Sequence, residues 1–490
     1  MTFLHRLLTP CLPLAVLLAL AGCAVGPTYQ PPGGPAATAW NAPLPHAGST
    51  AQLVDWWGQF NDPQLTTLLR QAEAASPSLA TAWANIAAAR ASLASSQSSF
   101  WPQLSASASA SRASNSVDSV GGTTASSSTF SSSSGTSTTY TGGLDASWEI
   151  DLFGKLRRTR EAARATVQAR VDDWHEARVS LAAEVADTYV QYRACQLDVA
   201  AYGEENDSQQ QTARLTRLSV NAGFTSPADG ALAEASAASV HAQLLSQQAD
   251  CEVLVKSLVA LVGGDEADLR RTLGAGSHAI PEPAGIAVSS VPADLVRQRP
   301  DLASSERALA AATATVGAAE ADRYPSFSLT GSISRSQSEP GVGLTGWSFG
   351  PSLSLPLFDG GQRRAAVSSA EASRDAALAS YQQAVRDAVK EVEQALVRLD
   401  SAARRTQDAS TAAEGYRRYF NATDLSWKAG NDSLLTREEA RRNSINADIN
   451  RIALQLEQVQ QWIALYKALG GGWTSTSLAT APASSQGETL

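Results

Sequence analysis

The chain repeats itself once along its length, and this duplication constrains the fold more than any other feature. Four short landmarks of the first half recur in the same order in the second half: Trp101-Pro102 with Tyr324-Pro325, Leu152-Phe153-Gly154 with Leu357-Phe358-Asp359, Ala222-Gly223 with Ala429-Gly430, and Ala260 to Gly263 with Ala468 to Gly470. The first spacing is the longest because the first copy carries a longer loop. A single repeat of this size indicates a duplicated unit, since solenoid repeats are only about 20–50 residues long.

Each copy contains two segments in which apolar and polar residues alternate. They cover about 103–112 and 143–152 in the first copy, and about 326–335 and 347–357 in the second. A period of two predicts strands with one apolar and one polar face. Strands of about ten residues with this pattern suit the wall of a transmembrane barrel, although surface hairpins of a soluble sandwich are the alternative. The Ser-, Thr- and Gly-rich stretches 114–141 and 336–346 are predicted as loops.

Most of the remaining chain is predicted to be helical. The helices cover about 76–99, 153–221 and 228–262 in the first copy, and about 300–322, 361–428 and 432–469 in the second. At 1.5 Å per residue each long helix would measure roughly 100 Å. Four strands are too few to close a barrel, for which at least about eight are needed. We therefore expect a mainly α chain that joins copies through its strands, with eight strands in a dimer or twelve in a trimer.

The N-terminus has the features of an export signal. A short apolar run, Leu12 to Leu20, precedes the sequence Leu20-Ala21-Gly22-Cys23. The run is too short to span a bilayer, and the four residues resemble the lipobox of bacterial lipoproteins, in which the Cys is diacylated and becomes the first residue of the mature chain. Ala24 in place of Asp resembles outer-membrane sorting. We expect residues 1–22 to be the signal and Cys23 to carry lipid, with an ordinary secretory signal as the alternative.

Charge and composition exclude several classes of function. The net charge is −9, whereas phosphate binding needs clustered Lys and Arg, so nucleic acid is not an expected partner. The five His residues are scattered without the spacing of metal ligands. No nucleophile and base stand at a catalytic spacing. We expect neither an enzyme nor a metal site, and no cofactor other than the covalent lipid on Cys23.

Three motifs identify a family resemblance. Residues 148–157 (WEIDLFGKLR), 292–302 (PADLVRQRPDL) and 356–361 (PLFDGG) resemble the strand exits and the inter-repeat motif of TolC-like outer membrane efflux proteins, in their NodT-type lipoprotein branch. The resemblance implies a homotrimer with a twelve-stranded β-barrel in outer membrane lipid and a long periplasmic α-barrel. It also implies two partners, a periplasmic adaptor (membrane fusion protein) and an inner-membrane efflux transporter of the resistance-nodulation-division type.

The resemblance and the landmarks divide the chain into six segments. In order, they are a signal peptide (1–22), a lipid-anchored extended segment (23–61), a first repeat (62–263), an inter-repeat linker (264–299), a second repeat (300–470) and a flexible tail (471–490).

The family resemblance also assigns a pore constriction to the helix turns at Ala222 to Pro227 and Lys428 to Ser433. Counted from the turn glycines, the acidic positions fall on Asp229 and Glu439, an apolar position on Leu435 and a basic position on Arg442. Residues 436–438 (TRE) depart from the Leu-rich runs common in the family, which leaves the inward register open. A plain helix cap is the alternative for Asp229, and a solvated charged face is the alternative for Glu439.

Two cysteines remain once Cys11 leaves with the signal and Cys23 takes lipid. Cys195 precedes Gly223 by the same number of positions by which Cys251 follows it. In an antiparallel hairpin turning at Gly223 they would lie at the same level, and the periplasm is oxidising. A disulfide is therefore expected, with two buried free thiols as the alternative.

The function expected from these features is a passive exit duct for drugs, metals or toxic metabolites. Two other functions compete with it. The first is the outer membrane exit of a protein secretion system, and the second is a periplasmic coiled-coil or adaptor lipoprotein that forms no channel. The lipobox and the NodT-like motifs favour small-molecule export.

Overall fold

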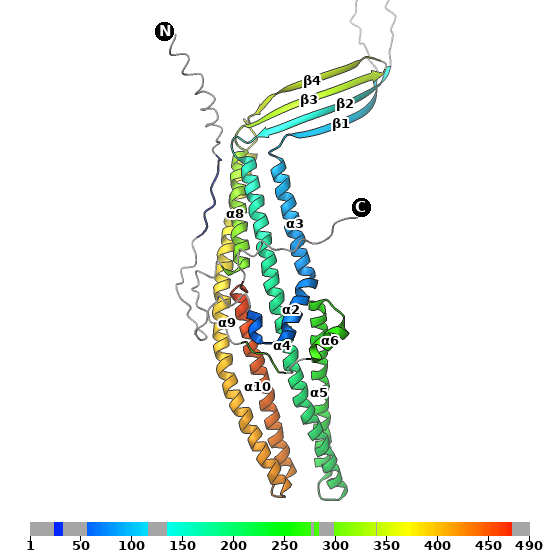
Figure 1. Ribbon diagram of the computed structural model, residues 1–490, viewed down its shortest axis with the longest axis vertical. Coiled ribbons are helices and arrows are strands. Elements are labelled where there is room, and N and C mark those ends of the chain that lie inside the picture. Colours follow the sequence, from blue (N-terminus) through cyan, green and yellow to red (C-terminus); the bar gives the residue numbers. More distant parts are fainter. Residues whose placement is uncertain are drawn as a thin grey trace, which may run out of the picture. The chain divides into compact units, whose positions relative to one another are not determined.

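The computed structural model describes residues 24–32, 56–115, 135–275, 279–283, 298–339 and 341–472. The predicted signal peptide, Cys23, the linker motif up to residue 297 and the tail after residue 472 lie outside these ranges. Within them the chain is mainly helical, with a single four-stranded sheet (Figure 1). The mainly α architecture predicted from the sequence is confirmed.

The duplication is visible in the lengths of the helices. The two long helices α4 (Lys155–Asn221) and α9 (Gln362–Lys428) each contain 67 residues. The helices before the strands, α3 (Pro77–Ser98) and α8 (Pro300–Ala321), each contain 22 residues. The return helices α5 (Pro227–Val262) and α10 (Leu434–Ala468) contain 36 and 35 residues. Among the described residues, no helix is long and apolar enough to cross a bilayer.

The sheet is antiparallel throughout, with its strands in chain order: β1 (Gln103–Asn115), β2 (Gly135–Ile150), β3 (Ser326–Glu339) and β4 (Gly343–Ser354). Leu144 pairs with Ile333, and Ile333 pairs with Trp347. Residues opposite one another in a sheet share a face. One face is therefore apolar across three strands, while Asp145, Ser332 and Ser348 form a polar row on the other.

The predicted loops are shorter in the structure than in the sequence interpretation. β1 continues to Asn115, β2 already begins at Gly135, and β3 extends to Glu339. These polar residues showed no apolar alternation, but their backbones pair with neighbouring strands, for example Thr138 with both Arg112 and Glu339. β4 ends at Ser354 rather than 357, because Pro356 has no N–H to donate to a ladder.

Two segments predicted without regular structure contain short helices. The end of the segment predicted to be extended forms the 3-10 helix η2 (Trp56–Phe60), in which Trp56 is fully buried and stacks on Tyr466 at 4.7 Å. The predicted linker contains α6 (Glu266–Gly274), capped by Asp265. An additional helix, α2 (Pro63–Ala75), precedes α3. Burial of aromatic rings stabilises η2. A cap and a short apolar stripe at Leu65, Leu68 and Ala72 form α2, and the sequence interpretation missed both.

The described chain divides into two compact units, and each unit contains parts of both repeats. The first comprises the sheet with residues 86–168 and 306–379, together with residues up to 31. The second comprises residues 32–85, 169–305 and 380–490. The main apolar core lies in the second unit, around Val185, Leu258 and Leu465.

The motif Arg299-Pro300-Asp301 joins three helices of the second unit. The buried Arg299 guanidinium pairs with Asp301 at 2.6 Å and with Glu391 of α9 at 2.8 Å. It also donates to the Ala468 carbonyl, at the end of α10, at 2.9 Å. Arg299 therefore fixes the start of α8 against α9 and the end of α10.

Candidate functional site

Both long helices end in the same type of turn. Gly223 and Gly430 each have φ of +79°, a conformation that favours glycine. After each glycine a backbone N–H donates a hydrogen bond to a carbonyl in the last turn of the helix. Phe224 donates to the Ser219 carbonyl at 2.9 Å, and Asn431 donates to the Ser426 carbonyl at 3.0 Å. Such αL turns close helix C-termini. The two predicted turns are thus equivalent structures, one in each repeat.

A serine caps the return helix after each turn. The Ser226 hydroxyl accepts from the Asp229 N–H at 3.2 Å and donates to the Asp229 carboxylate at 2.8 Å. Ser433 accepts in the same way from the Thr436 N–H at 3.0 Å. Asp229 therefore takes part in a helix cap, which was the alternative to a pore-lining role for this residue. Its side chain is also exposed, which a role in lining a pore requires.

The other residues assigned to the constriction lie on the exposed side of α10. Leu435 is 75% exposed, and Glu439 and Arg442 are exposed as well. Within the described ranges no ion pair joins Glu439 to Arg442, although their i,i+3 spacing permits one. Exposed side chains at these positions are available to neighbouring copies of the chain or to a lumen.

The carboxylate next to Glu439 has the opposite environment. Glu438 is only 7% exposed, and it accepts from the Ser208 hydroxyl of α4 at 3.1 Å. It also pairs with Arg437 at 2.5 Å, and Arg437 pairs in turn with Asp424 of α9 at 2.6 Å. This network of Ser208, Asp424, Arg437 and Glu438 connects α4, α9 and α10 near the turns. The sequence analysis did not identify it.

Charge shifts the pKa of one carboxyl in this network, and burial shifts the pKa of another carboxyl beside it. Hydrogen bonds from Lys428 and Arg437 hold the pKa of Asp424 below its usual range. Burial raises the pKa of Glu205, one turn before Ser208 on α4, and nearby Arg442 opposes that rise. The contact between α4 and α10 therefore contains ionisable groups of both signs.

A heptad pattern in α10 would have identified Glu438 from the sequence. Ile445, Ile452, Val459 and Tyr466 are seven residues apart, and all are buried. Seven-residue spacing of apolar residues marks a packed helix face. Glu438 lies seven residues before Ile445, at the next position of the same buried row. The pattern therefore predicts its burial, although its residue type does not suggest it.

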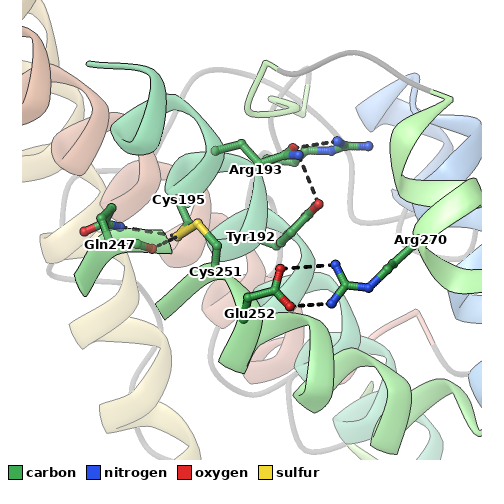
Figure 2. The surroundings of a disulfide bond; sticks show 8 residues. Tyr192, Arg193, Cys195, Gln247, Cys251, Glu252 and Arg270 are labelled. Carbon is green, nitrogen blue, oxygen red and sulfur yellow. Dashed lines mark hydrogen bonds and ion pairs between the residues drawn. A yellow bond between two sulfur atoms is a disulfide. The ribbon is translucent and has the colours of Figure 1, made fainter. Parts of the chain in front are cut away.

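A disulfide joins Cys195 of α4 to Cys251 of α5, with 5.7 Å between the Cα atoms (Figure 2). The Gln247 side-chain amide donates to the Cys195 sulfur at 3.3 Å. Beside it, Glu252 of α5 pairs with Arg270 of α6, which also contacts Glu266 at 2.8 Å. The first helical hairpin is thus covalently joined between α4 and α5, and exposed ion pairs add to the contacts of α6 with it.

The described residues contain no group of three or more His, Cys, Asp or Glu side chains arranged to hold a metal ion. Two antiparallel hairpins with capped turns, attached to a four-stranded sheet with one apolar face, define a class of protein. They are the subunit architecture of a TolC-like outer membrane channel.

Comparisons with known proteins support this class. Residues 68–264 and 291–471 match the family model of outer membrane efflux proteins. The chain is 31% identical over 470 residues to nodulation protein T of Rhizobium leguminosarum bv. trifolii, covering 94% of this chain and 97% of that protein. It is 30% identical to the toluene efflux pump outer membrane protein TtgC of Pseudomonas putida, covering 93% of both. The structure of the outer-membrane channel OprN superposes with a TM-score of 0.80 at 31% identity, over 92% of this chain and all of that one.

The chain belongs to the outer membrane efflux protein family. It is an efflux protein of the outer membrane, as the resemblance in its motifs predicted.

Proposed function

We propose that three copies of the chain form a passive exit duct for small molecules. The apolar face of the sheet is the observation that carries this proposal. Trp347 is 80% exposed, Phe349 70% and Leu104 72%. Soluble proteins rarely leave such a wide apolar surface uncovered, whereas outward-facing apolar residues are what lipid requires of a strand.

The open edges of the sheet support a closed oligomer. Among the described residues, β1 and β4 are each paired on one side only, and an unpaired strand edge is not tolerated in lipid. Pairing β4 of one copy with β1 of the next satisfies both edges. Three copies then give twelve strands in a closed wall, the arrangement expected for a TolC-like channel.

The helical hairpins would form the periplasmic continuation of this duct. Each copy contributes two antiparallel hairpins, α4 with α5 and α9 with α10. Their turns would face a periplasmic adaptor, which connects the duct to an inner-membrane efflux transporter. In this arrangement the pump selects and drives the cargo, and the duct catalyses no reaction.

The constriction of this duct would lie at the turns. A threefold axis gathers Asp229, Leu435, Glu439 and Arg442 of each copy into rings, and rings of carboxylates repel one another and attract cations. The cap between Ser226 and Asp229 holds one of these carboxylates at a fixed place in the first turn of α5. Lipid on Cys23 would add a second attachment to the outer membrane.

The names of the relatives suggest which cargo to test. TtgC is named for toluene efflux, and the relative ArpC of Pseudomonas putida is named for antibiotic efflux. Small apolar compounds and drugs are therefore the proposed cargo class.

A gene deletion tests this function. Cells without the chain are expected to become more susceptible to toluene and to apolar antibiotics, and wild-type protein should restore resistance. Protein lacking β1 and β2 is the control, since it cannot close the wall. Unchanged susceptibility combined with a defect in secreted proteins would instead favour the exit of a secretion system.

A further inference from the structure

The first described residues of the chain pack against the junction between the sheet and the helices. The Val25 N–H donates to the Phe153 carbonyl at 3.2 Å. The Tyr29 hydroxyl donates to the Glu306 carboxylate of α8 at 2.9 Å. Residues 24–30, here termed the N-terminal strap, are drawn in dark blue in Figure 1. The strap is therefore held at two points in the first compact unit.

Arg158 of α4 forms the centre of this contact. Its side chain is buried, with 8% exposed. Nε donates to the Val25 carbonyl at 3.4 Å, and Nη2 donates to the Gly26 carbonyl at 3.2 Å. Nη1 pairs with Glu161 at 2.9 Å. A guanidinium needs partners for its donors when it is buried, and the backbone of the strap supplies two of them.

Two glycines allow the strap to approach this closely. A Cβ at Gly317 of α8 would lie 2.9 Å from Nε of Arg158 and 3.0 Å from its Cδ, so the arginine stem lies flat over the helix backbone. Gly26 has φ of +89°, and a Cβ there would overlap the backbone of Gly317. The strap, Arg158 and Gly317 are thus in direct contact with one another.

We propose that Arg158, Gly26 and Gly317 form a clamp that positions the lipid anchor of the protein. This inference rests on the proposed acylation of Cys23, which is bonded directly to Ala24. Val25 is held at Phe153, between the end of β2 at Ile150 and the start of α4 at Lys155. The clamp fixes the attachment point of the acyl chains at the level where the sheet ends. The acyl chains on Cys23 then enter the lipid leaflet nearest the helices.

Chymotrypsin cleavage after Tyr29 tests the clamp on the purified mature protein in detergent. Cleavage releases residues 23–29, whose mass also reports the lipid. In the wild type the strap should be protected. Arg158→Gln, and Arg158→Lys as a variant that keeps the buried positive charge, should each be cleaved about tenfold faster or more, as expected when roughly 1.4 kcal/mol of restraint is lost. Arg160→Gln, an exposed residue two positions further along α4, should be cleaved at the wild-type rate.

The outcomes separate the clamp from the proposed function. The clamp would be overturned if both Arg158 variants were cleaved at the wild-type rate, or if Arg160→Gln were accelerated as much as they are. In either case an acylated fragment would still support the lipid anchor. An unacylated fragment would overturn the positioning of a lipid, and would leave the exit duct to be judged by the susceptibility of the deletion strain. Helical circular dichroism of every variant shows whether it has folded.

Discussion

At the scale of single residues, adjacent carboxylates on α10 have different environments. Glu438 is buried against Ser208 of α4, whereas Glu439 is exposed one position later. Successive helix residues point about 100° apart, so neighbours often differ in this way. Glu438 is therefore suited to holding the helices together, and Glu439 is suited to facing a lumen.

The exposed carboxylates lead to the first prediction. If Asp229 and Glu439 constrict the pore, the double variant Asp229→Ala, Glu439→Ala should raise single-channel conductance in planar bilayers by roughly twofold, because two rings of side chains that narrow the pore are truncated. Asp250→Ala, exposed on α5 far from the turn, is the matched control. A double variant with wild-type conductance would remove both residues from the constriction.

Asp198 leads to a prediction about pH. Burial raises the pKa of this α4 carboxyl from 3.8 to about 6, and its Oδ1 has no hydrogen-bond partner within the described residues. The folded state thus favours the protonated form, so stability falls as the pH rises from about 4 to about 6 and the cost is complete above that range. Because the side chain is partly exposed, we expect Asp198→Asn to stabilise the protein by only ~1 kcal/mol at pH 7.5.

Thermal unfolding followed by circular dichroism measures this effect. The gain from Asp198→Asn should be present at pH 7.5 and should disappear near pH 3, below both pKa values, where the wild-type carboxyl is mostly protonated in both states. Asp250→Asn should change neither value. A gain of equal size at both pH values would show that the ionisation of Asp198 is not its cause.

At the scale of elements, regular patterns in the sequence predicted structure well and local interactions escaped prediction. Alternation located the apolar part of each strand, such as Leu144 to Ile150, and repeated landmarks located both turns. The polar start of β2 was not predicted as strand, because its pairing is made by backbone groups, which leave no side-chain pattern. The helix α6 escaped because nine residues are too few for periodicity, and its cap Asp265 and its pairing through Arg270 are local.

The same limit applies to the candidate site. The turns and the exposed positions near them follow from counting along the repeats. The network of Asp424, Arg437 and Glu438 depends instead on which of several adjacent charges faces α4 and α9, and residue types alone do not decide this. Only the buried heptad row through Ile445 and Ile452 carries that information.

The two hairpins differ at their middles, which leads to a prediction at this scale. Counted from the turn glycines Gly223 and Gly430, the positions that match Cys195 and Cys251 in the second repeat are Ala402, which is buried, and Gln458. The first hairpin is thus joined by a covalent bond at a level where the second hairpin has no cysteine. A crosslink across a sequence separation of 56 residues typically contributes about 2–4 kcal/mol.

The double variant Cys195→Ala, Cys251→Ala should therefore accelerate hydrogen exchange in the middle of α4 and α5. Exchange in α9 and α10 should remain at the wild-type rate. Reduction of the wild-type protein with dithiothreitol is the matched control, and it should reproduce the pattern of the variant. Equal protection in wild type and variant would show that packing alone holds the first hairpin, and free thiols in unreduced protein would show that the bond does not form in the cell.

At the scale of the whole molecule, a single chain in water can neither cover the apolar face of its sheet nor pair the edges of that sheet. The sheet has an apolar face with Trp347 and Phe349 exposed, and within the part of the chain that the structure describes its edge strands β1 and β4 each lack a partner on one side. Lipid satisfies the first requirement, and pairing with further copies satisfies the second. Both requirements follow from the chain itself, and membership of the outer membrane efflux protein family agrees with them.

The mass of the assembled protein tests the central claim most directly. Native mass spectrometry of the mature chain, extracted from outer membranes in detergent, should give three chain masses and, after heating, one. A β4 variant with two successive prolines, Leu344→Pro and Thr345→Pro, loses an N–H on each side of the edge strand and should give the single mass without heating. Wild-type protein that remains a single chain and stays soluble without detergent would contradict the account, because no closed wall and no exit path would then exist.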